Sequence, residues 1–379
     1  MKIAVPNESG SGERRVALVP DVIKRLSGKG HEVVVESGAG EGARIPDALF
    51  EEAGAKIGSL EGADVVVRVT VPSAEDVERL PNGSVLIGFL APLTSPETAR
   101  ALASAGVTAF AMEAIPRISR AQSMDALSSQ ASVGGYRAAL IGAQELGRFY
   151  PMLTTAAGTI PPAKVLVLGA GVAGLQAIAT AKRLGAQVTA FDVRSVVKEQ
   201  VQSLGAKFLE LDIGADAEAA GGYARELTPE EQQRQQEALN EALSGFDVVI
   251  TTAQIPGRPA PKLVTEAGVR NMRPGCVIVD LAGEGGGNCE LTQPGETVIE
   301  HDVAIVAPLN LPSTMPEHAS QLYARNVMSL LELITGEEGQ LELNFEDEVV
   351  SGACITREGE IVHEGARKAA GQTQEQGAS

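Results

Sequence analysis

The chain has 379 residues, which is too long for one ordinary hydrophobic core and predicts two domains. Hydrophobic residues make up 44% of the chain but aromatic residues only 3%, so its cores must be built from aliphatic side chains. Thirty-one Lys and Arg residues against 49 Asp and Glu residues give a net charge of −18, which argues against nucleic acid or an anionic lipid surface as a partner.

The first half of the chain alternates between short apolar runs and amphipathic stretches. Such alternation is typical of strands and helices in a doubly wound parallel sheet. The expected strands are 2–5, 32–36, 63–69, 84–90 and 107–112. The expected helices are 21–27, 45–53, 74–80, 96–105 and 124–146.

A second alternating pattern begins after a Gly- and Pro-marked break at 158–162. Its expected strands are 164–168, 187–191, 207–210, 247–251, 277–280 and 303–306, and a helix is expected over 317–333. The residues therefore predict an α/β protein with two doubly wound, Rossmann-like domains and a cleft between them. We expect the first domain to comprise 1–140 plus 318–379 and the second 141–317. In the tail, 349–356 and 361–363 are expected to form a hairpin that returns to the first domain.

The second domain carries a glycine turn in the context that a dinucleotide requires. Gly169, Gly171 and Gly174 follow the apolar strand VLVL and begin a helix, and the next strand ends at Asp192. In this pattern the glycines permit a tight turn, a close approach of the pyrophosphate and close helix packing, while the acidic residue accepts hydrogen bonds from a ribose. Asp192 favours NAD over NADP, although Arg194 could hold a 2′-phosphate. The alternative is a glycine turn that binds nothing.

Two segments follow strands that should end at the same edge of the second sheet. They are TTAQIP at 251–256, with Ala253 and Gln254, and DLAGEGGG at 280–287. Ligands of open α/β sheets bind at the carboxyl ends of the strands, so both segments are expected to line the nicotinamide side. For TTAQIP the alternative is an ordinary exit from a strand into a loop.

A long, glycine-rich loop at 214–224 contains a single aromatic residue, Tyr223. Loops of this length are usually functional or disordered, and the sequence leaves open whether this one is a lid over the cofactor.

Metal and membrane sites are not expected. Cys276, Cys289 and Cys354 form no CxxC pair, so they are interpreted as buried thiols in a reducing compartment and no metal ligand is predicted. The N-terminus does not resemble a signal peptide. The longest apolar run, 165–181, is short for a membrane span and contains the glycine turn.

The chain lacks an obvious acid or base for carbonyl reduction. His301 and His318 are the only histidines that could serve, and a solvated or structural role suits them better. Hydride transfer from one nicotinamide to another requires no proton, only positioning of the rings. The polar segment from Arg117 to Ser128 has the hydrogen-bonding groups to hold a nicotinamide.

Several motifs together resemble the NAD(H)-binding alpha component of proton-translocating nicotinamide nucleotide transhydrogenase. They are PRISRAQSMDALSSQ, VLVLGAGVAGLQAIATAKRLGAQVTAFDVR, DVVITTAQIPGRPAP, DLAGEGGGNCE and NLPSTMPEHAS, and the resemblance covers nearly the whole chain. It implies that nicotinamide is surrounded by Arg117, Gln122, Asp125 and Ser128. It implies further cofactor contacts at Val172, Asp192, Val193, Arg194, Gln235 and Gln254, and a mobile loop that includes Gly222 and Tyr223. A Leu is common in the family where Gln254 stands.

Alanine dehydrogenase is a related family of the same architecture, and the chain departs from its pattern. Arg15 is kept, but Thr70 stands where that family has a Lys and Ala91 where it has a His. Glu284 replaces an active-site Asp. The acid and base that pyruvate chemistry needs are therefore missing, which favours a transhydrogenase role.

The resemblance also implies the partners. We expect a homodimer that docks on the cytoplasmic face of the membrane without entering it, beside a membrane-spanning component and a component that binds NADP(H). The implied reaction is NAD⁺ + NADPH ⇌ NADH + NADP⁺, coupled to proton translocation. The alternatives are an independent amino-acid dehydrogenase and an NAD-binding regulator without activity.

Overall fold

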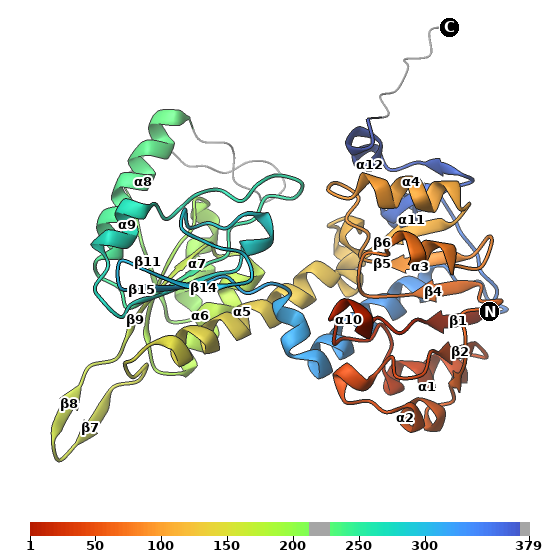
Figure 1. The fold of residues 1–379 in the computed structure, drawn as a ribbon, viewed down its shortest axis with the longest axis horizontal. Coiled ribbons are helices and arrows are strands. Elements are labelled where there is room, and N and C mark those ends of the chain that lie inside the picture. Colours follow the sequence, from red (N-terminus) through yellow and green to blue (C-terminus); the bar gives the residue numbers. More distant parts are fainter. Residues whose placement is uncertain (212–227, 372–379) are drawn as a thin grey trace, which may run out of the picture. The chain divides into compact units, whose positions relative to one another are not determined.

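The computed structural model describes residues 1–211 and 228–371, which fold into two compact units (Figure 1). The first unit comprises Met1–Gln130 and Pro312–Ser379, and the second comprises Ala131–Leu311. The first division falls inside helix α5 (Ala126–Glu145), which therefore contributes to both units. The second unit is thus an insertion into the first.

The first unit is built on an eight-stranded sheet whose central strands run parallel. Its strand order is β17 (Glu360–Ile361), β16 (Cys354–Arg357), β6 (Thr108–Ala111), β5 (Val85–Gly88), β4 (Val65–Val67), β1 (Lys2–Val5), β2 (Glu32–Val35) and β3 (Lys56–Ile57). In the middle of the sheet Ile3 pairs with Val65 and Ala4 with Val66.

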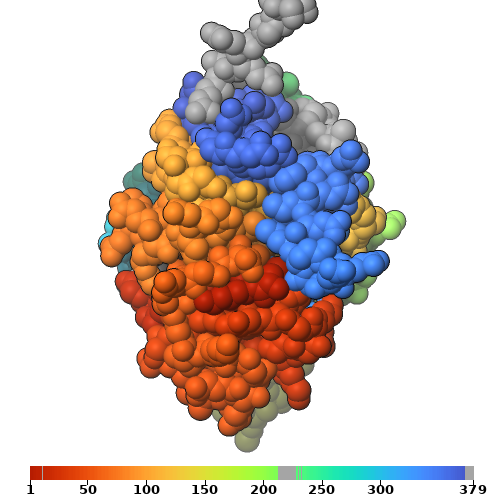
Figure 2. Space-filling view, turned by 90° about the vertical axis from the view of Figure 1, so that its right-hand side faces the viewer, coloured from red at the N-terminus to blue at the C-terminus, as the bar shows by residue number. Residues whose placement is uncertain are grey.

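Side chains of the first sheet alternate between two apolar layers, as the period of a strand requires. Ile3 and Val5 face one layer, and Ala4 faces the other. The first layer is covered by α1 (Pro20–Gly28), α2 (Asp47–Glu52), α10 (Pro316–Leu333) and α11 (Glu348–Ala353), and the second by α3 (Ala74–Glu78), α4 (Pro96–Ser104) and α12 (Glu364–Ala369). In Figure 2 the blue C-terminal residues lie beside the red and orange N-terminal residues of this unit.

The tail returns to the first sheet, as expected. Strand β16 pairs antiparallel with β6 and forms a hairpin with β17. Residues 348–353, expected to begin a strand, instead form the helix α11. Asp347 caps that helix, because its carboxylate accepts hydrogen bonds from the amides of Val349 and Val350.

The second unit contains a seven-stranded sheet that is parallel except at one edge. Its strand order is β11 (Lys207–Phe208), β10 (Gln187–Phe191), β9 (Lys164–Leu168), β12 (Val248–Thr251), β13 (Val277–Asp280), β15 (Val303–Val306) and β14 (Thr297–Glu300). One face packs on α5, α6 (Val172–Arg183) and α7 (Lys198–Ser203), and the other on α8 (Pro229–Leu243) and α9 (Glu266–Asn271). The predicted fold class, α/β with two units around parallel-dominated sheets, is confirmed.

One predicted break is in fact a strand. Strands β7 (Leu153–Thr155) and β8 (Gly158–Ile160) form an antiparallel hairpin that stands off the sheet of the second unit (Figure 1). Pro161 and Pro162 then lead into β9. The glycine that suggested an interruption occupies the turn of this hairpin, where its φ is +126°.

Candidate functional site

The glycine turn follows β9 and begins α6. Gly169 has a φ of +99°, a conformation that favours glycine, and a Cβ there would lie 2.5 Å from the Thr252 hydroxyl. A Cβ on Gly174 would lie 1.9 Å from the Gly169 carbonyl oxygen, so glycine is needed for the helix to pack on the turn. Gly171 differs, because its φ of −75° and ψ of −168° suit any residue and a Cβ would meet no atom within 4 Å. Packing of the described chain therefore requires two of the three glycines and leaves open space in front of Gly171.

Asp192 follows β10 and lies against the glycine turn. Its carboxylate accepts a hydrogen bond of 2.8 Å from the Ala170 amide and one of 2.9 Å from the Arg194 amide. Arg194 also donates from Nε and Nη2, each at 2.9 Å. The Asp192 side chain is only 6% exposed. A ribose hydroxyl would have to share this carboxylate with Arg194 or displace its guanidinium.

The segment after β12 is held against the glycine turn. The Thr252 hydroxyl lies 3.2 Å from the Gly169 carbonyl oxygen, to which it donates. The next residue, Ala253, is held at both backbone groups by the fully buried side chain of Asn288. Asn288 also donates to the carbonyl of Pro261 at 2.8 Å. Asn288 was not among the predicted site residues, although it stands in the glycine-rich segment that follows β13.

Asp280, at the end of β13, has a structural role. Its buried carboxylate accepts four hydrogen bonds of 2.6–3.0 Å, from the hydroxyls of Thr251 and Thr292 and from the amides of Ala282 and Cys289. These bonds close the glycine-rich loop on itself and join it to β12. The loop is thereby shaped from within.

Three further predicted cofactor contacts lie near this edge of the second sheet. Val172 is the first residue of α6 and is 42% exposed. Val193 is partly buried beside the core of the unit. Gln254 is exposed, and its Nε2 donates to the carbonyl of Leu281 at 2.9 Å.

Gln235, the predicted contact on α8, is buried with an unsatisfied polar atom. Its side chain is 6% exposed, and Oε1 has no hydrogen-bond partner among the described residues. Buried unpaired oxygens are rare in folded proteins and call for a partner. Gly222 and Tyr223, together with the predicted 214–224 loop, lie outside the described residues.

The four predicted nicotinamide contacts lie in the first unit, around a 3-10 helix at Ser119–Met124. Arg117 and Gln122 are exposed, and the Gln122 side chain makes no hydrogen bond to another described residue. Asp125 caps α5, since its carboxylate accepts from the amide of Ser128 at 2.8 Å and from its hydroxyl at 2.6 Å. The segment therefore presents two exposed polar side chains beside a capped helix start.

Two anchors of this segment escaped sequence reasoning because they come more than 200 residues later in the chain. Asn326 on α10 donates from Nδ2 to the Ser123 carbonyl at 2.8 Å. Asp347 accepts two hydrogen bonds of 2.9 Å from the Arg120 guanidinium, which lowers the pKa of the Asp347 carboxyl. The polar character of the segment is thus explained in part by these anchors, with Arg120 serving as one of them.

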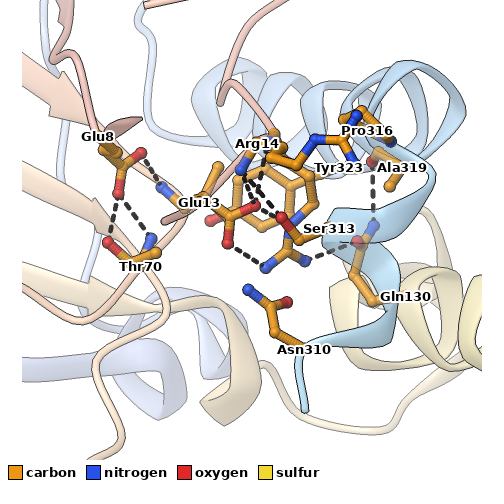
Figure 3. A network of polar contacts seen from close by, with 12 residues as sticks. Glu8, Glu13, Arg14, Thr70, Gln130, Asn310, Ser313, Pro316, Ala319 and Tyr323 are labelled. Carbon is orange, nitrogen blue, oxygen red and sulfur yellow. Dashed lines mark hydrogen bonds and ion pairs between the residues drawn. The ribbon is translucent and has the colours of Figure 1, made fainter. Parts of the chain in front are cut away.

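A separate polar network lies at the carboxyl ends of strands in the first unit (Figure 3). The Glu8 carboxylate accepts from the amides of Val69 and Thr70 at 2.7 Å and from the Thr70 hydroxyl at 2.6 Å. Arg68 lies 3.4 Å away. Burial raises the pKa of Glu8 despite the opposing effect of Arg68. Thr70 is therefore a hydrogen-bonding residue bound to Glu8.

Ala91 lies in a strained turn held by Glu113. Its φ is +48°, which is uncommon for a residue with a Cβ. Glu113 Oε1 accepts from the amides of Leu90 at 2.9 Å and Ala91 at 2.6 Å, and burial raises the pKa of this carboxyl. The side chains at 70 and 91 are thus a hydroxyl and a methyl group, neither of which exchanges protons near neutral pH.

Arg15 is buried in the same unit and is held by other side chains. Its Nε and Nη2 donate to the two oxygens of Glu13 at 2.9 and 2.8 Å, and its Nη1 donates to Gln130 Oε1 at 2.8 Å. Gln130 in turn donates to the Ala319 carbonyl on α10 (Figure 3). Arg15 therefore joins the N-terminal segment to the helix that begins at the predicted nicotinamide contacts.

Within residues 1–211 and 228–371, no cluster of three or more His, Cys, Asp or Glu side chains has the arrangement of a metal site. No helix of that part of the chain combines the length and the apolar character needed to span a bilayer.

Comparison with known families agrees with the architecture. Residues 4–134 match the family described as alanine dehydrogenase/PNT, N-terminal domain. Residues 138–364 match the one described as alanine dehydrogenase/PNT, C-terminal domain. The two matches account for most of the chain.

Individual relatives separate two groups. The chain is 52% identical over 376 residues to the first of the polypeptides that make up NAD(P) transhydrogenase subunit alpha of Rhodospirillum rubrum, covering 96% of this chain and 98% of the relative. A transhydrogenase structure from Sinorhizobium meliloti has a TM-score of 0.88 at 46% identity, covering 96% of this chain and 100% of that one. Alanine dehydrogenase of Mycolicibacterium smegmatis is 30% identical over 380 residues, covering 97% and 96%. The predicted resemblance is confirmed, with alanine dehydrogenases as more distant relatives.

Proposed function

Because the chain belongs to the alanine dehydrogenase/PNT family, we propose that it is the NAD(H)-binding subunit of a membrane-bound, proton-translocating transhydrogenase of the Re/Si-specific type. Hydride passes directly between NAD(H) on this chain and NADP(H) on a partner component. Proton translocation takes place in a separate membrane-spanning component.

The observation that carries this choice within the family is the pair Thr70 and Ala91. Reduction of pyruvate needs a group that gives or takes a proton beside the nicotinamide. The Thr70 hydroxyl is bonded to Glu8, and Ala91 has no polar side chain. Transfer of hydride between two nicotinamides has no such requirement, so the same residues suit a transhydrogenase.

The second unit fits a bound dinucleotide. The open space at Gly171 leaves room for the pyrophosphate at the N-terminus of α6, where partial positive charge favours phosphate. Gly169, Gly174 and Val172 shape or border this turn. Asp192, Val193 and Arg194 are assigned to the ribose, and Ala253, Gln254 and Gln235 to further contacts with the cofactor. Gly222 and Tyr223 are assigned to a loop over it.

Arg117, Gln122, Asp125 and Ser128 are assigned to the nicotinamide end. Bound NAD(H) supplies or accepts the hydride at its ring. The exposed amide of Gln122 and guanidinium of Arg117 are suited to bind and orient the carboxamide and ribose, while Asp125 and Ser128 hold the start of α5. We expect the ring to lie in a cleft between the two units.

The proposed assembly is a homodimer docked peripherally on the cytoplasmic side of the inner membrane, beside the NADP(H)-binding and membrane-spanning components. The β7–β8 hairpin supports the homodimer, because it exposes apolar side chains that a partner copy could cover. Met152 is 63% exposed and Ile160 is 47% exposed. Sedimentation of the purified chain tests this, and a monomer at micromolar concentration contradicts it.

A mixing assay tests the reaction. The purified chain and the separately purified NADP(H)-binding component should together transfer hydride from NADPH to an NAD⁺ analogue with a shifted absorbance. The chain with pyruvate, ammonia and NADH should show no oxidation of NADH. Oxidation that depends on pyruvate would assign the chain to the amino-acid dehydrogenases. NAD binding without transfer would indicate a regulator.

Arg117→Ala and Gln122→Asn test the residue assignment in the same assay. We expect hydride transfer to slow by about tenfold or more with NADH affinity largely kept, because positioning and not binding is impaired. Gln144→Asn is a matched control, as Gln144 is an exposed residue near the other end of α5. Equal rates in Gln122→Asn and Gln144→Asn would remove Gln122 from the site.

A further inference from the structure

The 3-10 helix Ser119–Met124, here called the holder segment, is a short element that makes few bonds of its own. A 3-10 helix has poorer hydrogen-bond geometry than an α-helix and is rarely long. The exposed Gln122 lies in the holder segment and Asp125 follows it directly. Any residue that holds its backbone in place therefore also sets the position of these side chains.

Asn326 joins helix α10 to the backbone of the holder segment. Its Nδ2 donates to the carbonyl of Ser123 at 2.8 Å, and its Oδ1 accepts from the Ser129 hydroxyl at 2.7 Å. One amide group thus connects the holder segment to the first turn of α5. The Asn326 side chain touches both sides of Asp125 in the sequence.

The position of Asn326 is itself well determined. The residue is 7% exposed, and its neighbours Tyr323, Val327 and Leu330 belong to the apolar core of the first unit. Gln130 donates to the Ser129 hydroxyl at 3.2 Å and to a carbonyl of α10, which strengthens the same connection. Buried, satisfied networks of this kind rigidify the groups that they join.

The Arg120 ion pair is a weaker anchor of the holder segment. The Arg120 side chain is 45% exposed, and its partners Asp347 and Glu348 are 21% and 64% exposed. Exposed ion pairs hold their partners loosely because water and salt screen them. The buried amide and the exposed ion pair can therefore be compared on the same segment.

The geometry points to Asn326 as a positioning residue that holds Gln122 and Asp125 in place for the nicotinamide without touching the cofactor. This inference rests on the proposed function for the identity of the ligand. The hydrogen bond from Asn326 to Ser123 is the contact on which the positioning depends. Small displacements of positioning groups slow a reaction strongly, with losses on the order of 100-fold for about 1 Å.

Asn326→Ala and Asn326→Asp test the role. Asp has nearly the same shape and keeps the acceptor for Ser129, but its carboxylate cannot donate to the Ser123 carbonyl. Both variants are expected to slow single-turnover hydride transfer by about tenfold or more, while the NADH dissociation constant changes less than about threefold. Asn326→Asp with a wild-type rate would overturn the inference.

Val327→Ala and Arg120→Ala are the matched controls. Val327 is fully buried on the same helix, so its truncation destabilises the first unit without removing the bond to Ser123. We expect Val327→Ala to lower the melting temperature at least as much as Asn326→Ala does, with hydride transfer within about twofold of wild type. Arg120→Ala should also stay within about threefold. A rate loss in Val327→Ala equal to that in Asn326→Ala would show a general effect of stability and overturn the role.

Amide hydrogen exchange separates this inference from the proposed function. In Asn326→Ala and Asn326→Asp the amides of residues 122–125 should exchange about tenfold faster than in wild type, and in Val327→Ala they should not. Unchanged exchange at 122–125 overturns the inference whatever the chain catalyses. Faster exchange in a chain that transfers no hydride would keep the anchoring by Asn326 and reject the proposed function, and the role toward nicotinamide with it.

Discussion

Arg194 donates to both oxygens of the Asp192 carboxylate, through Nε and Nη2 at 2.9 Å each. The same carboxylate accepts from the Ala170 amide in the glycine turn, so it shapes the turn and stands at the ribose position together. A paired carboxylate repels a phosphate less than an isolated one, because the guanidinium cancels its charge at short range. Arg194 therefore weakens the discrimination that Asp192 alone would provide.

Arg194→Ala is expected to sharpen the preference for NADH. Loss of the guanidinium exposes the charge of Asp192 and removes the cation that Arg194 would offer to a 2′-phosphate. The ratio of the NADPH to the NADH dissociation constant should rise about tenfold, corresponding to about 1.4 kcal/mol. Fluorescence titration with both nucleotides measures it. Tighter NADPH binding in the variant would show that Arg194 has no role in holding a phosphate.

Gly171→Ala and Gly174→Ala should separate binding from folding. A Cβ at Gly171 meets open space, so Gly171→Ala should change the free energy of unfolding by no more than about 1 kcal/mol while NADH affinity falls about tenfold or more. A Cβ at Gly174 would overlap the Gly169 carbonyl, so that variant should lose about 2 kcal/mol or more of stability. Urea unfolding and NADH titration check both. Undiminished affinity in Gly171→Ala would place the pyrophosphate elsewhere.

Asn288→Ala should loosen the segment after β12. The change leaves the buried amide and carbonyl of Ala253 and the carbonyl of Pro261 without their partner, which should cost about 2–4 kcal/mol of unfolding free energy. NADH should bind several-fold more weakly to the folded variant. Asn271→Ala is the control, since this exposed residue makes one bond of 3.2 Å and should shift stability by no more than about 0.5 kcal/mol. Calorimetry and titration distinguish the two.

His363 should make stability depend on pH. Its Nδ1 accepts from the Ala366 amide at the start of α12, and burial lowers the pKa of the imidazole. A lowered pKa means that the unfolded chain binds the proton more readily than the folded one. The contribution is therefore complete above the ordinary pKa of about 6.5 and is lost as the pH falls through the lower folded pKa.

The measurement compares wild type with His363→Asn, because Asn also caps a helix and does not titrate in this range. Between about pH 7.5 and about pH 5.5, the window around the ordinary imidazole pKa, the urea midpoint of wild type should fall more steeply than that of the variant. His31, whose pKa is also lowered by burial, is unchanged in both proteins and cancels from the comparison. Parallel curves would show that His363 is not the titrating group.

The regular parts of the fold follow from the sequence because strands and helices of a parallel sheet leave strong periodic patterns. Every strand expected in the second unit is present, as are the glycine turn and its acidic partner. The β7–β8 hairpin was missed because its strands are short and largely exposed, so they show no apolar alternation. Strand β14 was missed for a similar reason, as it lies at an edge of the sheet.

The supports of the candidate site were less predictable than its principal residues. A glycine turn is local in sequence, whereas the bonds from Asn326 to Ser123 and from Arg120 to Asp347 join residues far apart in the chain. Only folding brings such pairs together. The double use of Asp125, as a helix cap and a proposed nicotinamide contact, was likewise ambiguous until the Ser128 bonds were known.

The insertion of the second unit into the first has a consequence for synthesis on the ribosome. The core of the first unit requires α10 and β16, which emerge after the whole of Ala131–Leu311 has been translated. At typical elongation rates this takes roughly 10–35 s, during which strands β1–β6 lack their covering helix and an edge partner. The half of the protein made first is therefore completed last, and it is the half that nascent-chain chaperones should bind.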